Sequence, residues 1–365
     1  MKYEKPPLTM DEQCSQLIRR GLPEHERKII FETLSTINYY RLSAYFLPFQ
    51  QDKIEHNFKA GVLFKQILNL YHFDTQFRNI LMPIIEQAEV LARMRITYHL
   101  VTKYKDPFVH TNQLIYTNKF LGRQIAREDL IRFYKGTKGS IDWNLIWGTL
   151  CELNLIDRKG NIINSNIDID ALPAEWNNDL KSAILKSFSQ SPYDEWIEKM
   201  HSSVRESKEE FIRHYLDKYY PETKKFPLWI VSEIISFGQL SKLYAGLNSS
   251  DRKAIAAQYN LPHRIFGQWL HSLVYLRNVC AHHSRIWNRE LEIRATCPKD
   301  LPERGSWSNR VFSLLLVLRY LTPPTMQWNT IIWRLRWLFW NNRFIDIHAM
   351  GFPKNWDNIL KKVYS

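Results

Sequence analysis

The stretch from Leu276 to Arg285, with the sequence LRNVCAHHSR, holds residues whose types and spacing favour chemistry. Arg277 and His282 are five positions apart, and Asn278 directly follows the arginine. A neutral imidazole can take the proton of a ribose 2′-hydroxyl near neutral pH, because its ordinary pKa lies in that range. A guanidinium can hold the phosphate and neutralise the charge that develops in the transition state. Arginine and histidine therefore suffice for RNA cleavage without a metal ion.

Helix geometry limits what one copy of this stretch can do. Five residues subtend about 140° on an ideal helix, so Arg277 and His282 do not stack on each other. Asn278 and His282 are four residues apart and share a face, so Asn278 can orient the imidazole. Two copies of the helix, related by a two-fold axis in a homodimer, would bring arginine and histidine from both chains together. The spacing alone also fits a face that binds phosphate or is simply solvated.

Basic and aromatic residues elsewhere are further candidates for contacts with RNA. Arg285 and Arg289 either follow an RNA backbone or are solvated, and the local excess of positive charge favours RNA. Tyr40 and Arg41 can stack an unpaired base and hold phosphate. Core packing around one exposed arginine is the interpretation that we favour for this pair. Trp333, Trp337 and Trp340 recur at helical spacing. We predict that they form a stripe that faces the core and not a surface on which bases stack.

The charge balance favours a nucleic acid as the partner. The 365 residues include 50 Lys and Arg against 37 Asp and Glu, a net charge of +13. Positions 261–350 hold 12 basic and 5 acidic residues, and 11 of the basic residues are Arg, whose planar fork suits phosphate. A hydrophobic fraction of 45% with 14% aromatics excludes a disordered protein. Only 12 Gly disfavours both a glycine-loop nucleotide fold and a turn-rich β-sandwich.

The sequence indicates no metal, no cofactor and no membrane partner. Its four cysteines are far apart in the chain, so neither a zinc site nor a disulfide framework is predicted. The N-terminus lacks the apolar core of a signal peptide. The longest apolar runs are too short, or too often interrupted by Arg, to span a bilayer. We therefore expect a cytoplasmic protein.

Helices are expected to position the motif. Thr9 and Glu12 have the spacing of a capping box, which predicts a helix start. Apolar residues recur every three or four positions from Leu70 to Leu91, which predicts a long helix that Pro83 kinks or divides.

The same long helix carries two pairs of opposite charges. Asp74 and Arg78 are four residues apart, as are Glu89 and Arg93. We interpret both pairs as ordinary support on the helix surface.

Residues 107–192 differ from the rest of the chain. A short helix is predicted over 142–155, and residues 156–163 have the turn and the β-branched flanks of a hairpin. The segment is either a winged-helix-like module or an irregular insertion packed on the main domain, which we favour. The chain is thus expected to be mostly α, a helical bundle with an N-terminal helical segment and a mixed α/β-hairpin insertion. The expected divisions are 1–60, 61–106, 107–192 and 193–365.

The stretch RNVCAHHSRIWNR resembles the signature of the HEPN superfamily (higher eukaryotes and prokaryotes nucleotide-binding). Ribonucleases of that superfamily carry an R-x4-6-H motif, often with Asn after the Arg. Further collinear blocks are similar to the AbiD/AbiF branch of bacterial abortive-infection proteins. These blocks are LTMDEQCSQLIRRGL, INYYRLSAYFLPF, LYHFDTQFRNILMPIIEQAEVLARMRITYHL, PLWIVSEIISFGQLSKLY and MGFPKNW. Residues 107–192 match nothing that we can place.

The resemblance implies a HEPN-type helical bundle and a metal-independent endoribonuclease that leaves a 2′,3′-cyclic phosphate. Arg277, Asn278 and His282 fall on the catalytic motif, and His283 beside them is a candidate substrate contact. The long helix that packs beside the motif helix in such domains carries three residues in supporting roles, namely Asp74, Arg78 and Glu86. The RNA-guided type VI CRISPR nucleases are among the relatives. Some family members act in phage defence as toxins restrained by a partner such as a structured non-coding RNA.

Three functions remain in competition at this point. The first, which we favour, is a dimeric HEPN ribonuclease that acts as an antiphage toxin on host or phage RNA. The second is an RNA-binding protein without cleavage, in which Arg277 and His282 only contact phosphate. The third is a nucleotide-binding scaffold, which the lack of a phosphate-cradling glycine loop disfavours.

Overall fold

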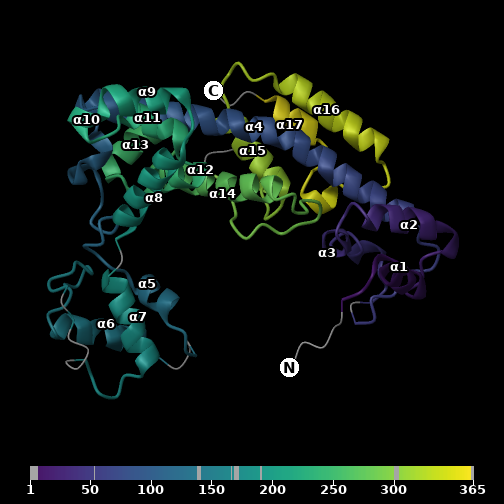
Figure 1. Cartoon of the computed structure of the whole chain (residues 1–365), viewed down its shortest axis with the longest axis horizontal. Coiled ribbons are helices and arrows are strands. Elements are labelled where there is room, and N and C mark those ends of the chain that lie inside the picture. Colours follow the sequence, from purple (N-terminus) through teal and green to yellow (C-terminus); the bar gives the residue numbers. More distant parts are fainter. Residues whose placement is uncertain are drawn as a thin grey trace. The chain divides into compact units, whose positions relative to one another are not determined.

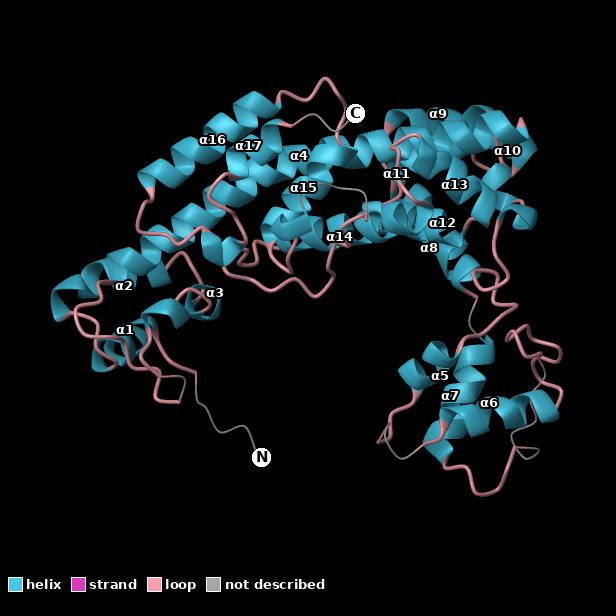
Figure 2. Ribbon diagram, turned by 180° about the vertical axis from the view of Figure 1, so that it is seen from behind, coloured by secondary structure: helices cyan, strands magenta, loops and turns pink. Residues whose placement is uncertain are grey.

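The computed structural model describes residues 7–52, 54–137, 141–165, 167, 172–189, 191–299 and 304–362. Helices dominate this part of the chain (Figures 1 and 2), which confirms the prediction of a mostly α protein. β pairing among the described residues is limited to isolated bridges. No helix among them is both long enough and apolar enough to cross a membrane.

The α-helices are connected by turns, short 3-10 helices and loops. In chain order they are α1 (Met10–Arg19), α2 (Arg27–Leu34), α3 (Tyr39–Ser43), α4 (Phe64–Tyr104), α5 (Arg127–Phe133), α6 (Trp143–Glu152), α7 (Asn178–Ser189), α8 (Pro192–Glu206), α9 (Glu210–Lys218), α10 (Tyr220–Thr223), α11 (Leu228–Ile234), α12 (Phe237–Gly246), α13 (Ser249–Ala257), α14 (His263–Ala281), α15 (Val311–Leu321), α16 (Trp328–Asn341) and α17 (Trp356–Lys361).

The chain divides into two compact units. The first comprises residues 1–91 and 268–365, and the second comprises residues 92–267. Both boundaries fall inside helices, α4 and α14, and neither coincides with a division expected from the sequence.

Two helix starts in the first unit follow from hydrogen bonding to free backbone N–H groups. Thr9 and Glu12 form the predicted capping box at the start of α1. The start of α4 is capped from a distance, because the carboxylate of Glu26 accepts the N–H groups of Phe64 and Lys65. Helix α4 then continues through Pro83 to Tyr104, so the proline does not divide it.

Aromatic rings fill the core of the first unit. Phe73 and Phe77 of α4 lie 6.1 and 6.5 Å from the ring of Phe339 in α16, measured between centroids. Phe352 packs edge-on against Phe77 and Phe339. Helix α15 is buried along most of its length between positions 311 and 318. These contacts hold α4 rigidly where it carries Asp74 and Arg78.

Helix α16 has two apolar sides, and the side that the sequence predicts to face the core is the exposed one. Its buried side chains include Ile331, Leu335 and Phe339. Trp333, Trp337 and Trp340 are instead 64, 54 and 62% exposed. The prediction that these tryptophans face the core is wrong, because the aliphatic residues of the other side already fill it.

A buried carboxylate joins two helices of the second unit. Asp251 in α13 is fully buried and accepts hydrogen bonds from Lys103 (2.6 Å) and Tyr104 (2.7 Å) of α4. The ring Nε2 of His99 lies 3.0 Å from the same carboxylate. Burial of a charge at this position is tolerated because every side of the carboxylate has a polar partner.

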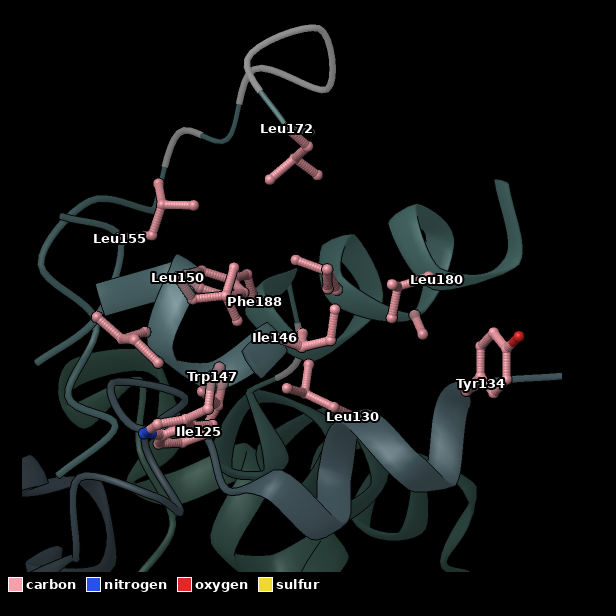
Figure 3. Close-up of a cluster of buried hydrophobic side chains, with 13 residues drawn as sticks. Ile125, Leu130, Tyr134, Ile146, Trp147, Leu150, Leu155, Leu172, Leu180 and Phe188 are labelled. Carbon is pink, nitrogen blue, oxygen red and sulfur yellow. The ribbon is translucent and has the colours of Figure 1, made fainter. Parts of the chain in front are cut away.

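Helices α5, α6 and α7 surround a separate hydrophobic core within residues 107–192 (Figure 3). Its buried members all lie between Ile125 and Phe188 and include Leu130, Leu150 and Ile184. This segment therefore has a core of its own, rather than being only irregular chain packed on another domain.

The hairpin predicted at 156–163 is not confirmed. The described residues show a turn closed by one antiparallel bridge, between Ile156 and Ile162. The Asp157 carboxylate accepts the N–H groups of Lys159 and Asn161 at 2.8 Å each, which favours the turn itself. Asn161 pairs with Gln124 in a second isolated bridge. Neither bridge is part of a strand among the described residues. No wing is present in the part of the chain that the structure describes.

His110 is a buried residue of the second unit whose charge is strongly disfavoured. It is 1% exposed, and neither ring nitrogen has a hydrogen-bond partner among the described residues. Burial, with a smaller contribution from the nearby His201, lowers the pKa of His110 to about 4. The unfolded chain therefore binds a proton here that the folded chain does not bind between pH 6.5 and 4.

We predict that acidification from pH 7 to 4 lowers the free energy of unfolding by roughly 3 kcal/mol through His110. Stability rises with pH wherever the unfolded state binds more protons, so the loss starts below about pH 6.5. The variant His110→Leu should lack this part of the pH dependence in denaturant unfolding, whereas His271→Gln, at an exposed position, should keep it. Equal pH dependence in wild type and His110→Leu would contradict the prediction.

Candidate functional site

The predicted motif lies at the C-terminal end of α14. The helix buries one side through Trp269, Leu273, Leu276 and Cys280. Arg277 and Asn278 are exposed on the other side, and the exposed His282 is the first residue after the helix. The amphipathic pattern of α14 thus directs the chemically active side chains to solvent.

The motif side chains have no protein partners within the described residues. Arg277, Asn278 and His282 form no side-chain hydrogen bond or ion pair there. The bond between Asn278 and His282 is a backbone one, in which the Asn278 carbonyl accepts the His282 N–H at 2.9 Å. The predicted orientation of the imidazole by the Asn278 side chain is therefore not formed in this structure. All three groups remain available to a ligand.

A Schellman turn ends α14 and gives His283 a backbone role. Ser284 N–H donates to the Val279 carbonyl at 2.9 Å, and His283 N–H donates to the Cys280 carbonyl at 3.0 Å. This turn requires a left-handed residue, and His283 has φ = 54° where glycine is usual. The left-handed backbone costs a residue with a side chain about 1–2 kcal/mol.

A buried carboxylate holds the segment that follows the turn. Asp74 of α4 is 0% exposed. It accepts the backbone N–H groups of Ile286 (3.1 Å) and Trp287 (2.7 Å) and the hydroxyl of Tyr45 (2.7 Å). The guanidinium of Arg78 donates to the same carboxylate. The main chain behind the motif is thus fixed to α4 at its exit from the helix.

Two guanidinium groups bind the carbonyl groups of the same turn. Arg41 of α3 donates to the His283 carbonyl at 3.0 Å, and Arg78 donates to the Ser284 carbonyl at 3.3 Å. Positive groups are favoured at a helix C-terminus because its carbonyl ends carry partial negative charge. Arg41, proposed as a phosphate contact, therefore also positions the motif through the backbone.

The interpretation of Asp74 and Arg78 as a surface pair is wrong. They are 0 and 4% exposed, because the segment after the motif covers α4 at this point. Arg93 is also buried, and it donates to the Ile235 carbonyl at 2.9 Å. Glu86 lies three helical turns beyond Asp74, is exposed, and forms no hydrogen bond or ion pair with any described residue. It does not join Asp74 and Arg78 around the motif.

Tyr45 is a member of this network that the sequence did not single out. Its hydroxyl donates to Asp74 and accepts from Arg78 at 3.3 Å. Burial raises the pKa of Tyr45, as does the adjacent Asp74 carboxylate. In the sequence, Tyr45 belongs to the block INYYRLSAYFLPF. Nothing in that block distinguishes it from the neighbouring aromatic residues, so its role could not be predicted.

The local environment also determines which groups can react. Burial raises the pKa of the Cys280 thiol to about 12, so this cysteine is a poor nucleophile although it lies inside the motif. Burial likewise raises the pKa of Asp74, against the opposing effect of the Arg78 charge. No group of three or more His, Cys, Asp or Glu side chains that could hold a metal ion is found among the described residues.

Arg289 is held by a hydrogen bond within the protein, whereas Arg285 is half-buried and its guanidinium forms no hydrogen bond or ion pair with any described residue. Both are half-buried, and burial lowers the pKa of Arg285. Arg289 donates through Nε to the hydroxyl of Tyr275 at 2.9 Å, which lies on α14 two residues before Arg277. Arg310 adds a third guanidinium, bonded to Asn288 at 2.9 Å. Glu290 pairs with Arg310 at 3.1 Å and Glu292 lies 4.0 Å from Arg289, so the segment after the motif is a mixed cluster of charges in which Arg285 has no acidic partner among the described residues.

Tyr40 does not pack in the core, contrary to the interpretation that we favoured. It is 73% exposed, whereas the neighbouring Tyr39 is half-buried and accepts a hydrogen bond from Arg20 at 2.8 Å. The alternative, in which Tyr40 stacks an unpaired base, is compatible with this exposure.

We predict that Asp74→Asn lowers the free energy of unfolding by about 3–5 kcal/mol, because it leaves the Arg78 charge buried without a counter-ion. Glu86→Gln, on the exposed side of the same helix, should change it by less than about 0.5 kcal/mol. Tyr45→Phe, which removes the hydroxyl that donates to Asp74 and accepts from Arg78, should cost about 2 kcal/mol. Denaturant unfolding of the three variants measures all three values. An Asp74→Asn protein as stable as Glu86→Gln would show that the network does not hold the turn.

Comparison with models of known protein families finds one match, to Abi-like protein, over residues 32–142 and 162–288. The match includes Asp74, Arg78 and the whole motif at 277–282. It also extends into residues 107–192, the segment that we could not place from the sequence. No curated protein and no solved structure matches the chain. Because the matched residues make up more than half of the chain, it belongs to the Abi-like protein family, a family of abortive-infection proteins.

Proposed function

We propose that this protein is a metal-independent HEPN endoribonuclease of the AbiD/AbiF branch, acting in the cytoplasm as an antiphage toxin. One observation carries the proposal. Arg277, Asn278 and His282 are exposed at the end of α14 while the backbone behind them is fixed by Asp74. The fixed backbone sets where these side chains begin, and their polar groups stay available to a substrate or to a second copy of the motif, which would hold them in place.

The proposed reaction uses the ribose as its own nucleophile. His282 accepts the proton of the 2′-hydroxyl, and the 2′-oxygen bonds to phosphorus. The bond between phosphorus and the 5′-oxygen then breaks, and the 5′-oxygen takes a proton from an acid. Arg277 binds the phosphate and neutralises the charge that builds on its oxygens. The products are a 2′,3′-cyclic phosphate and a 5′-hydroxyl.

A homodimer would complete this site. Arg277 and His282 lie about 140° apart around the helix axis if the helical geometry is continued to His282. A second copy of the motif would supply a second His282, which can serve as the acid that protonates the 5′-oxygen. Two-fold symmetry would place arginine and histidine of both copies around one phosphate.

The resemblance to restrained toxins supports a further part of the proposal. We infer that a partner, such as a structured non-coding RNA, holds the enzyme inactive until infection. Nucleic acid that copurifies with the His282→Ala variant is the direct test, because this variant can bind RNA without degrading it. A discrete RNA species that suppresses cleavage by the wild type would identify the inhibitor.

We predict that His282→Ala reduces RNA cleavage by about 10²–10⁴-fold, because the general base is lost. The matched control is His283→Gly, which removes the neighbouring imidazole and suits the left-handed backbone at that position. Because the general base is still present, this variant should keep the cleavage rate at saturating RNA, with any loss confined to RNA affinity, and gain up to about 1 kcal/mol of stability. Cleavage of total RNA is measured in EDTA, with the ends analysed for cyclic phosphate.

Two outcomes would count against this assignment. Activity that EDTA abolishes and added Mg²⁺ restores would contradict the arginine–histidine mechanism. RNA binding by the wild type with no cleavage, after any copurifying RNA is removed, would favour the binding protein without nuclease activity.

We predict that mixing Arg277→Ala with His282→Ala restores part of the activity that each variant lacks alone. In a mixed dimer one copy supplies the arginine and the other the histidine, so a composite site regains both. The measurement is cleavage by the mixture after co-expression or subunit exchange. A mixture no more active than its components, from chains shown by mass measurement to exchange, would place the whole site in one chain.

A further inference from the structure

The outer side of α16 combines exposed indoles with guanidinium groups. We call this surface the aromatic–arginine face, formed by Trp333, Arg334, Arg336, Trp337, Trp340 and Arg343. All six side chains are exposed. The sequence of α16, WNTIIWRLRWLFWN, contains no acidic residue. Large exposed apolar groups in one patch usually mark a binding surface.

A groove runs beside these indoles. It has a volume of about 490 Å³, and Trp333, Trp337 and Trp340 line it together with Ile347 and Trp356. Planar rings beside an open groove offer flat surfaces on which another planar group can stack.

The arginines on this face differ in how they are held. Arg336 forms an ion pair with Asp357, which fixes its direction while it remains half-exposed. The guanidinium of Arg343 lies over the ring of Trp340, 5.1 Å from its centroid. Arg334 forms no hydrogen bond or ion pair with any described residue. Two of the three arginines can therefore bind an anion without first losing an acidic partner.

We propose that the aromatic–arginine face binds a single-stranded segment of RNA, with bases stacked on the tryptophans and phosphates bound by Arg334 and Arg343. This inference rests on the proposed function, because it names the form of RNA that the enzyme takes. Single-stranded nucleic acids are bound in this way, by aromatic rings that stack bases and basic groups that follow the backbone.

The spacing of the tryptophans favours an extended strand. Along a helix, four residues rise about 6 Å and three residues about 4.5 Å. Both values exceed the rise of about 3.4 Å per nucleotide in a duplex strand. Bases on successive indoles would thus be unstacked from one another, which a duplex does not allow.

The loop that follows α16 contacts the segment that follows the motif. The indole N–H of Trp287 donates to the Asp346 carbonyl, just beyond α16, at 3.3 Å. The backbone N–H of the same Trp287 donates to Asp74. RNA held on α16 would therefore be bound on the same unit as Arg277 and His282.

Charge and geometry disfavour two other occupants. A two-fold dimer through this face would oppose the arginines of two identical surfaces without free acidic groups to pair with them. A helix that lies on a membrane keeps basic and apolar residues on separate faces. In α16 the tryptophans and arginines share one face, and the opposite face is buried in the core.

The test measures binding separately from cleavage, in the His282→Ala background with a fluorescent, 2′-O-methylated uridine oligomer that cannot be cleaved. We expect Trp333→Ala with Trp340→Ala to weaken binding at least tenfold at every salt concentration, because stacking does not depend on counter-ions. Arg334→Ala and Arg343→Ala should each reduce the slope of log affinity against log salt by about 0.7. The matched control is Trp229→Ala, at a tryptophan of α11 that is 48% exposed, which should change neither quantity.

Several outcomes would overturn the inference while leaving the nuclease intact. One is unchanged affinity in the tryptophan variants, measured on protein whose helical circular dichroism is normal. A second is loss of binding only together with loss of the dimer by light scattering, which would make the face a contact between copies. A third is loss of binding to anionic phosphatidylserine vesicles with RNA affinity unchanged. Failure of the proposed function is measured separately, as the absence of RNA cleavage by the protein in which His282 is intact.

Discussion

The carboxylate of Asp74 is the group on which the geometry of the motif depends. It lies fully buried yet accepts hydrogen bonds from Tyr45, Arg78 and two successive backbone N–H groups. Ile286 and Trp287 are themselves buried, so without the carboxylate their N–H groups would lose both water and protein partners. One side chain of α4 thereby determines where the main chain leaves α14. Burial of this charge costs free energy. In return, the hydrogen bonds that the carboxylate needs are available in one arrangement of the main chain after α14, which specifies that arrangement.

The site separates structural from reactive groups. The backbone from His283 to Trp287 is held by Arg41, Arg78 and Asp74, none of which is part of the R-x4-H motif. His283, a candidate substrate contact, takes the strained left-handed conformation that the turn requires. Strain borne by a residue outside the motif leaves His282 itself free of both distortion and partners.

The sequence was informative where the signal is local and silent where it is not. The capping box at Thr9, the long helix from Phe64 and the exposed motif on α14 follow from patterns of a few residues. The bonds from Asp74 to Ile286 and Trp287 join positions more than 200 residues apart, and no spacing rule reaches that far. Periodicity also failed on α16, because that helix is apolar on two sides and the pattern does not say which one meets a core. The pair of Asp74 and Arg78 is buried because a segment more than 200 residues further along the chain covers it, which no local pattern indicates.

The excess of positive charge therefore has two origins, which the sequence alone does not distinguish. Several arginines donate to backbone carbonyls and so serve the fold, as Arg41, Arg93 and Arg95 do. Others, such as Arg277 and Arg334, have no partner among the described residues. Only this second group can release counter-ions from a nucleic acid without giving up a bond within the protein. The net charge of +13 thus overstates the charge that is free to bind an anion, and the proposed RNA contacts rest on exposed arginines such as Arg277 and Arg334.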